Sequence, residues 1–273
     1  MKKLFCTLLV SLLCLSGSVV QAAKVDTLSV HSNAMNRNIT VLTVRPDKAV
    51  GGEKCPVIYL LHGHGGNAFT WMTIKPDLPQ IADREGIIFV CPDGKNSWYW
   101  DSPRNKDYRY ESFVAKELVE YIDKNFATKT DRSGRVITGL SMGGHGGMWL
   151  SIRHQDIFGG GGSMSGGLDI RPFPDSWNMK AQLGEYASNK EVWDSHTVIN
   201  QLDKLQNGAL TIMIDCGADD FFLEVNKAVH EALLKRGIGH DFTIRPGAHN
   251  PQYWSNAIDY QILFFKKFFN KSK

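Results

Sequence analysis

The sequence predicts an α/β fold in which a mostly parallel central sheet is covered by helices on both faces. Two observations lead to this prediction. Short, continuous apolar runs end in glycine or polar residues, as strands buried on both faces do. Segments with apolar residues at helical spacing lie between these runs. The chain has 273 residues, 42% of them hydrophobic, and no repeat or Pro- or Ser-rich linker marks a boundary, so we expect one domain over residues 23–273.

The elements follow in order along the chain. Strands are predicted first at residues 24–31 and 39–44, the second ended by Pro46 and the Gly51-Gly52 turn, and then at 56–61, an apolar run that closes in glycines. From residue 87 strands and helices alternate. Further strands are predicted at residues 87–91, 135–140, 159–165, 210–216 and 241–245.

The predicted helices include residues 110–126, a helix through His154 after the strand at 135–140, and a last helix that ends near Phe269. Residues 166–208 look irregular and contain Trp177 and Trp193. An insertion at the carboxyl ends of strands in an α/β sheet usually shapes a pocket, so we expect this segment to lie over a site.

Residues 1–22 are predicted to be a secretory signal peptide. Lys2 and Lys3 precede a short apolar stretch, and a small-x-small cleavage site ends at Ala22. The stretch is too short to span a bilayer, so we expect no stable membrane insertion and a secreted or periplasmic protein. A retained apolar helix and a lipoprotein anchored at Cys14 are the alternatives, although Leu13 is bulkier than the residue that normally precedes a lipid-bearing cysteine.

Composition excludes several classes of protein. Removing the two signal lysines from the formal charge of +3 leaves +1, which gives no reason to expect a nucleic-acid partner. The remaining Cys55, Cys91 and Cys216 match no zinc or redox spacing, and the last two close apolar runs, where a small buried residue is expected. The cysteines therefore indicate neither a zinc nor a redox site, and composition says nothing about the oligomeric state.

A nucleophile motif lies between a predicted strand and a predicted helix. The sequence Gly139-Leu140-Ser141-Met142-Gly143 has the G-x-S-x-G pattern of the α/β-hydrolase nucleophile elbow, in which a tight strand-to-helix turn exposes the serine. A bare match could be an ordinary Gly-rich turn. Its position after a strand and before a helix favours the α/β-hydrolase fold, with Ser141 as the nucleophile.

A serine nucleophile needs a base within hydrogen-bond reach. In this fold the order along the chain is serine, acid, histidine, which leaves three candidates for the base. His230 falls within a helical run and His240 opens a strand, whereas His249 follows the strand at residues 241–245 at the same edge of the sheet as the elbow. His249 is therefore the predicted base.

The acid is expected in the loop after the strand at residues 210–216. Asp215 is still on the strand and ranks last, and the choice between Asp219 and Asp220 stays open on position alone. Either of these two could instead cap the following helix.

Acyl transfer also needs donors for the oxyanion. We predict the backbone N–H groups of Met142 and of His64, the latter in the glycine-rich loop that follows the strand at residues 56–61. His62 and His64 could be mistaken for a metal pair, but no third ligand stands at metal-ligand spacing. Trp98 and Trp100 follow the strand at 87–91 and are candidates for a substrate pocket, with ordinary loop packing as the alternative.

Taken together, these residues resemble the esterase D-like carboxylesterases, a group with S-formylglutathione hydrolases, tributyrin esterases and family 1 carbohydrate esterases that act on feruloyl or acetyl groups. The resemblance covers nearly the whole chain after residue 22. It rests on Tyr59-Leu60-Leu61-His62-Gly63, the elbow with Gly144, Cys216-Gly217-Ala218-Asp219-Asp220-Phe221, and Ala248-His249 followed by Tyr253-Trp254.

The resemblance implies that the acid is Asp220, the last residue of a Gly-x-x-Asp run, and that no metal or cofactor takes part. Trp254, which follows His249, is a further candidate for substrate binding. The predicted signal peptide departs from cytosolic formylglutathione hydrolases and favours extracellular esters. The expected function is a secreted serine carboxylesterase for short-chain or aromatic acyl esters on carbohydrate. The alternatives are an acyltransferase or a peptidase with the same triad, and an inactive carbohydrate-binding protein.

Overall fold

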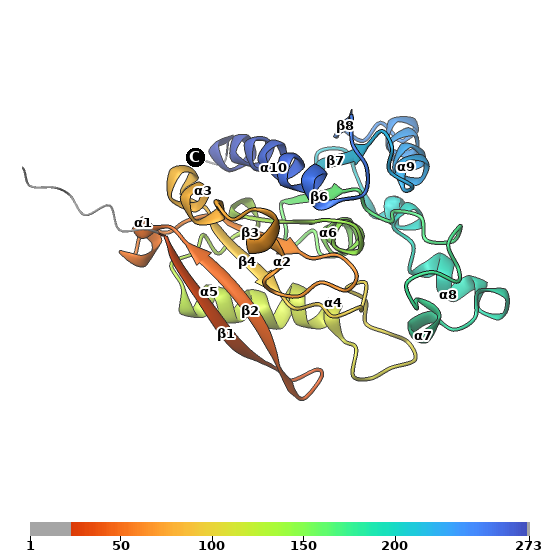
Figure 1. The fold of residues 1–273 in the computed structure, drawn as a ribbon, viewed down its shortest axis with the longest axis horizontal. Helices are drawn as coiled ribbons and strands as arrows, with labels where there is room; N and C mark the ends of the chain where they lie inside the picture. The colour runs from red at the N-terminus through yellow and green to blue at the C-terminus, as the bar shows by residue number, and fades with distance from the viewer. Residues whose placement is uncertain (1–22, 272–273) are drawn as a thin grey trace, which may run out of the picture.

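A computed structural model describes residues 23–271, so the predicted signal peptide at residues 1–22 lies outside the described residues. The described chain forms one eight-stranded sheet with helices on both faces (Figure 1). The strand order is β1-β2-β4-β3-β5-β6-β7-β8. β2 is antiparallel to both β1 and β4, and all other neighbours are parallel. This confirms the predicted fold class.

The strands lie within one or two residues of the predicted ranges. They are β1 Lys24–Ser32, β2 Arg37–Arg45, β3 Val57–Leu61, β4 Ile88–Pro92, β5 Arg135–Gly139, β6 Gly160–Met164, β7 Thr211–Gly217 and β8 Asp241–Arg245. Every residue of β3, β4, β5 and β6 is buried, because helices cover both faces of the sheet. Continuous apolar runs at β3 and β4 are the sequence signature of this double burial.

Two groups of helices cover the sheet. Core residues of α3 (Leu78–Glu85) and α10 (Pro251–Lys271) pack on one face, and those of α5 (Leu118–Asn125), α6 (Met142–Arg153) and α9 (Leu223–Lys235) on the other. The predicted helix at residues 110–126 is a continuous run of α4 (Tyr110–Ser112), a π-helical turn Phe113–Glu117 and α5. No described helix is long and apolar enough to cross a membrane.

Short helices account for the remaining differences from the predicted elements. α1 (Asp47–Val50), α2 (Thr70–Ile74) and α3 were not predicted. The segment predicted to be irregular contains α7 (Lys180–Leu183), α8 (Lys190–Ser195) and two 3-10 turns, Tyr186–Ser188 and Val198–Lys204. Except for α3, these α-helices span six residues or fewer, too short for an apolar period to repeat.

Candidate active site

The predicted nucleophile lies on the sharp turn between β5 and α6. Ser141 has backbone angles φ 54° and ψ −119°, a conformation that L-residues rarely adopt. Its N–H donates to the carbonyl of Met164 on the neighbouring strand β6. A Cβ at Gly143 would lie 2.3 Å from the carbonyl oxygen of Leu61, so only glycine lets α6 start this close to β3. The local geometry is that of a nucleophile elbow.

Ser141, His249 and Asp220 form one hydrogen-bonded chain. The Ser141 hydroxyl lies 2.9 Å from Nε2 of His249, and Nδ1 of His249 lies 2.9 and 3.0 Å from the two carboxylate oxygens of Asp220. The Asp220 side chain is fully buried, and that of His249 is 15% exposed. The loops after β5, β7 and β8 deliver the three residues to the same edge of the parallel sheet.

The structure separates the three candidate acids. Asp219 is exposed, and Asp215 is buried on β7, where it accepts hydrogen bonds from Tyr253 and Arg245. Asp220 is the one of the three that contacts His249, and it also accepts the N–H of Phe222 at 2.8 Å, at the start of α9. It therefore orients the imidazole and also holds the turn that leads into α9.

The loop after β3 lies against the nucleophile. A Cβ at Gly63 would come within 3.3 Å of the Ser141 Cβ. Among the described residues, neither the N–H of His64 nor that of Met142 donates to a protein acceptor. Both are thus free to bind a substrate oxygen, which is consistent with the predicted oxyanion donors.

Both histidines of this loop have structural contacts. His62 is buried, its Nδ1 lies 2.7 Å from the carbonyl of Gly63, and its Nε2 accepts the N–H of Gly94 at 2.8 Å. Burial lowers the pKa of His64, while a backbone hydrogen bond with Trp177 acts in the opposite direction. The imidazoles therefore connect the loop to the segment after β4 and to the insertion. The described residues contain no group of three or more His, Cys, Asp or Glu side chains that could hold a metal ion.

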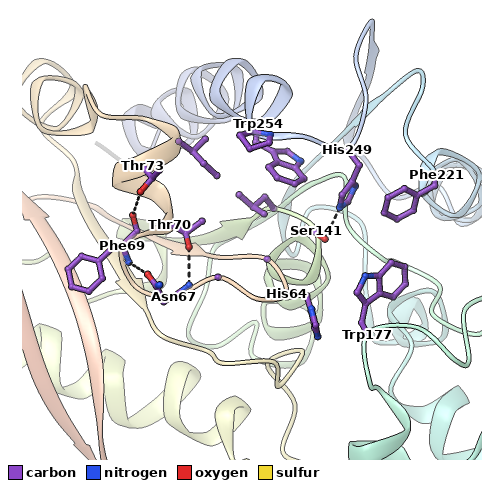
Figure 2. A pocket seen from close by; sticks show the side chains of 15 residues that line it. His64, Asn67, Phe69, Thr70, Thr73, Ser141, Trp177, Phe221, His249 and Trp254 are labelled. Atoms are coloured by element: carbon purple, nitrogen blue, oxygen red, sulfur yellow. Dashed lines mark hydrogen bonds between the residues drawn. The ribbon is translucent and has the colours of Figure 1, made fainter.

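A cavity of about 600 Å³ opens at Ser141, within the usual size range of small-molecule sites (Figure 2). Trp177 and Phe221 form one side, and their rings stack with centroids 5.8 Å apart. Trp254, as predicted, and residues of α2 form the other side. The prediction that the insertion shapes a pocket is confirmed at Trp177. The complete lining is Gly63, His64, Gly66, Asn67, Phe69, Thr70, Thr73, Ile74, Leu140, Ser141, Trp177, Phe221, His249, Pro251 and Trp254.

Trp98 and Trp100 do not line this cavity, so the prediction that they contact substrate is corrected. Both are at most 1% exposed, and their stacked rings pack against His145 of α6. Positive φ values at Trp98 (55°) and Tyr99 (61°) turn this segment inward. The alternative of ordinary packing in a long loop is the one that the structure bears out.

The α2 side of the pocket and Phe221 were not predicted from the sequence. Phe221 had a usable signal, since it directly follows the acid Asp220 in the loop that reaches the site. Phe69, Thr70 and Thr73 had none, because α2 is only five residues long and its place beside Ser141 depends on the glycine-rich loop before it.

Comparison with known proteins identifies the family. Residues 32–265 match the family model described as "Putative esterase". The chain belongs to this esterase family. Among the curated relatives of this esterase are an acetyl esterase of Caldicellulosiruptor saccharolyticus, 26% identical over 85% of this chain and 94% of the relative, and an S-formylglutathione hydrolase of Arabidopsis thaliana, 28% identical over 70% and 73%.

Solved structures of other proteins have the same fold. A ferulic acid esterase superposes with a TM-score of 0.78 at 26% identity and covers 90% of this esterase and 98% of its own chain. The fluorophosphonate-binding serine hydrolase F of Staphylococcus aureus superposes with a TM-score of 0.81 at 21% identity, over 90% and 99%, and supports the fold. This esterase is therefore a hydrolase that acts on ester bonds, and it has the α/β-hydrolase fold.

Proposed function

We propose that this esterase is a secreted serine carboxylesterase that hydrolyses short-chain or aromatic acyl esters of carbohydrates through an acyl-Ser141 intermediate. The observation that carries the proposal is the hydrogen-bonded chain from Ser141 through His249 to Asp220 at the floor of a cavity with aromatic walls. The acetyl and ferulic acid esterases among the relatives support these acyl groups.

In the first half of the reaction, Oγ of Ser141 attacks the ester carbonyl carbon while Nε2 of His249 takes the hydroxyl proton. The N–H groups of His64 and Met142 stabilise the oxyanion. The bond to the alcohol then breaks, and His249 gives its proton to the departing oxygen. Asp220 holds the imidazole in the tautomer with a proton on Nδ1 and stabilises the imidazolium.

In the second half, a water molecule attacks the acyl-Ser141 carbonyl carbon and gives a proton to His249. The bond to Ser141 Oγ breaks, Oγ recovers the proton from His249, and the carboxylic acid leaves. The balance is one ester and one water consumed for one acid and one alcohol formed. An acceptor hydroxyl in place of water would make the same site an acyltransferase.

The first test is hydrolysis of p-nitrophenyl acetate, butyrate and octanoate and of methyl ferulate by residues 23–273, with Ser141→Ala as control. We expect ester hydrolysis by the wild type and a loss of roughly 10⁴-fold or more in kcat in the variant. Equal inactivity of both on every ester would contradict hydrolysis. Rates that rise only when a sugar is added as acceptor would indicate transfer instead.

The role of Asp220 as the triad acid can be tested by comparing it with the adjacent aspartate, Asp219. Asp220→Asn leaves the side-chain volume nearly unchanged but removes the charge that sets the histidine tautomer, so we expect kcat to fall by roughly 10³- to 10⁴-fold. Asp219→Asn is the matched control, because Asp219 is exposed and outside the hydrogen-bonded chain, and its kcat should stay within about two-fold of wild type. Equal losses in both variants would contradict the assignment.

The proposal that the protein is secreted rests on the residues before Ala23 and needs its own test. When the full chain is expressed in a bacterium, we expect the activity in the periplasm or medium and an N-terminus at Ala23. Retention in the cytoplasm with Met1 intact would contradict secretion, and release from membranes only by detergent would indicate the lipid anchor.

A further inference from the structure

The active-site cavity continues into a polar groove between α2 and α10. A second cavity of about 500 Å³ shares Thr73, Ile74 and Pro251 with the cavity at Ser141. From there it runs along α10, which packs against α2. Its other lining residues, all polar, define what we call the α2–α10 groove: Lys75, Gln252, Ser255, Asn256 and Asp259.

The groove has one wall made by a single face of α10. Gln252, Asn256 and Asp259 are spaced by four and three residues and so lie in a row about 10 Å long. The side chains of Gln252 and Asn256 are exposed and form no hydrogen bond to another described residue. Two amides with free donors and acceptors therefore point to a ligand with hydroxyl groups rather than to an acyl chain.

The charged residues of the groove form an ion pair at its end away from Ser141. Lys75 is 9% exposed, and its Nζ lies 2.8 Å from the Asp259 carboxylate and 3.5 Å from that of Asp77. Because its charge is already paired with carboxylates of the protein, Lys75 does not present a free cation to an anionic ligand. The lining as a whole suits a neutral, polyhydroxylated molecule.

The opposite side of Ser141 has different chemistry. Figure 2 shows Ser141 and His249 between Trp177 and Phe221 on one side and Thr73 and Trp254 on the other. The Trp177 side is aromatic and ends at the cavity wall. The Thr73 side also has aromatic rings next to Ser141, those of Trp254 and Phe69, but beyond Thr73 it leads into the polar groove. An ester has two halves joined at the carbonyl carbon that Ser141 attacks, and each side of the site matches the chemistry of one half.

We propose that the α2–α10 groove binds the polyhydroxylated alcohol half of the ester, a neutral oligosaccharide, with Gln252 and Asn256 as its specificity-determining residues, while the acyl group lies toward Trp177 and Phe221. This rests on the proposed ester hydrolysis and adds which part of the protein selects the alcohol. Recognition extends beyond the sugar that carries the acyl group, because the groove continues along α10 away from Ser141.

The test uses pairs of esters in which the acyl group is the same and the alcohol differs. The pairs are ethyl acetate with acetylated xylotriose, and methyl ferulate with feruloylated xylotriose. For the wild type we expect kcat/KM to be at least ten-fold higher on the sugar ester of a pair. In the double variant Gln252→Ala/Asn256→Ala this preference should fall by about ten-fold or more, because two hydrogen bonds to the sugar are lost. The kcat/KM values for the small esters should stay within about two-fold of wild type. Alanine keeps the exposed helix positions stable.

Lys267→Ala is the matched control, because Lys267 is exposed on α10 and lies outside the groove. A second variant, Asn256→Trp, fills the groove and should also lower only the sugar-ester rates. Equal wild-type rates on both esters of each pair, or an equal change of both rates in the double variant, would overturn the proposal while ester hydrolysis stands. Absence of activity on every ester would instead refute the proposed function itself.

Discussion

At the scale of single residues, the site depends on a backbone conformation that costs stability. Ser141 has φ 54° and ψ −119°, and the surrounding contacts hold it there: its N–H is bonded to Met164, and the next turn of α6 packs on Leu61 through Gly143. Such strained residues cost about 1–3 kcal/mol each. The serine side chain is thus held at the cavity at the expense of folding free energy.

The strain predicts an unusual order of stabilities for two inactive variants. Ser141→Gly should be more stable than Ser141→Ala by about 1 kcal/mol, because glycine adopts this conformation without steric cost, although its unfolded chain is more flexible. The measurement is the free energy of unfolding in urea for both variants. An alanine variant more stable than the glycine variant by about 0.4–1 kcal/mol, the difference expected from the unfolded chain alone, would show that the turn is not strained.

At the scale of elements, the active site is assembled from loops at one edge of the sheet, and each loop has a distinct task. The loops after β3, β5, β7 and β8 contribute His64, Ser141, Asp220 and His249. The segment after β6 adds Trp177, whose ring contacts Phe221 and Trp98. Variation of that segment can therefore change the acyl pocket without moving the catalytic residues.

Trp177 and Phe69 give a matched pair of variants for the two sides of the pocket. Trp177→Ala should raise KM for methyl ferulate by roughly ten-fold or more, because an aromatic wall of the proposed acyl site is lost. The KM for p-nitrophenyl acetate should change by less than about three-fold. Phe69→Ala removes a ring that is 45% exposed on the other side and should have the smaller effect on methyl ferulate. The reverse order would place the acyl group on the α2 side.

At the scale of the whole molecule, a buried histidine connects the nucleophile helix to the insertion and to the loop after β4. His145 is fully buried, its Nδ1 lies 2.9 Å from the carbonyl of Gly167, and its Nε2 accepts the indole N–H of Trp100 at 2.8 Å. Burial lowers the pKa of His145 to about 3. The folded protein therefore contains a neutral imidazole across the whole ordinary pH range.

This histidine predicts a loss of stability in acid. Between pH 6.5 and about 3 the unfolded chain binds a proton at His145 that the folded protein does not, so the free energy of unfolding falls as the pH falls through this window. The contribution is at most about 1.4 kcal/mol per pH unit. His145→Gln keeps an acceptor for Trp100 and should reduce the slope of unfolding free energy between pH 6 and 4 in urea titrations. An unchanged slope would contradict the assignment.

The strands, Ser141 and His249 could be predicted from the sequence, because buried strands and the elbow have local signals and the fold sets the order in which the histidine follows. Doubly buried strands need unbroken apolar runs, and the elbow needs its glycines within five residues. The choice between Asp219 and Asp220 was not settled by position, since adjacent residues of a loop differ only in the direction of their side chains. Trp98 and Trp100 were misjudged because two consecutive positive φ angles turn their rings toward His145.

The sequence by itself determined the α/β class, the positions of the strands along the chain, and the residues able to act as nucleophile and base. These follow from the periodicity of apolar residues and from a motif within a short stretch of chain. Only the tertiary structure decided which aspartate meets His249, which tryptophans face the cavity, and that a polar groove leaves it between α2 and α10. These features join segments far apart in the chain, such as Lys75 and Asp259, and depend on packing that no local pattern records.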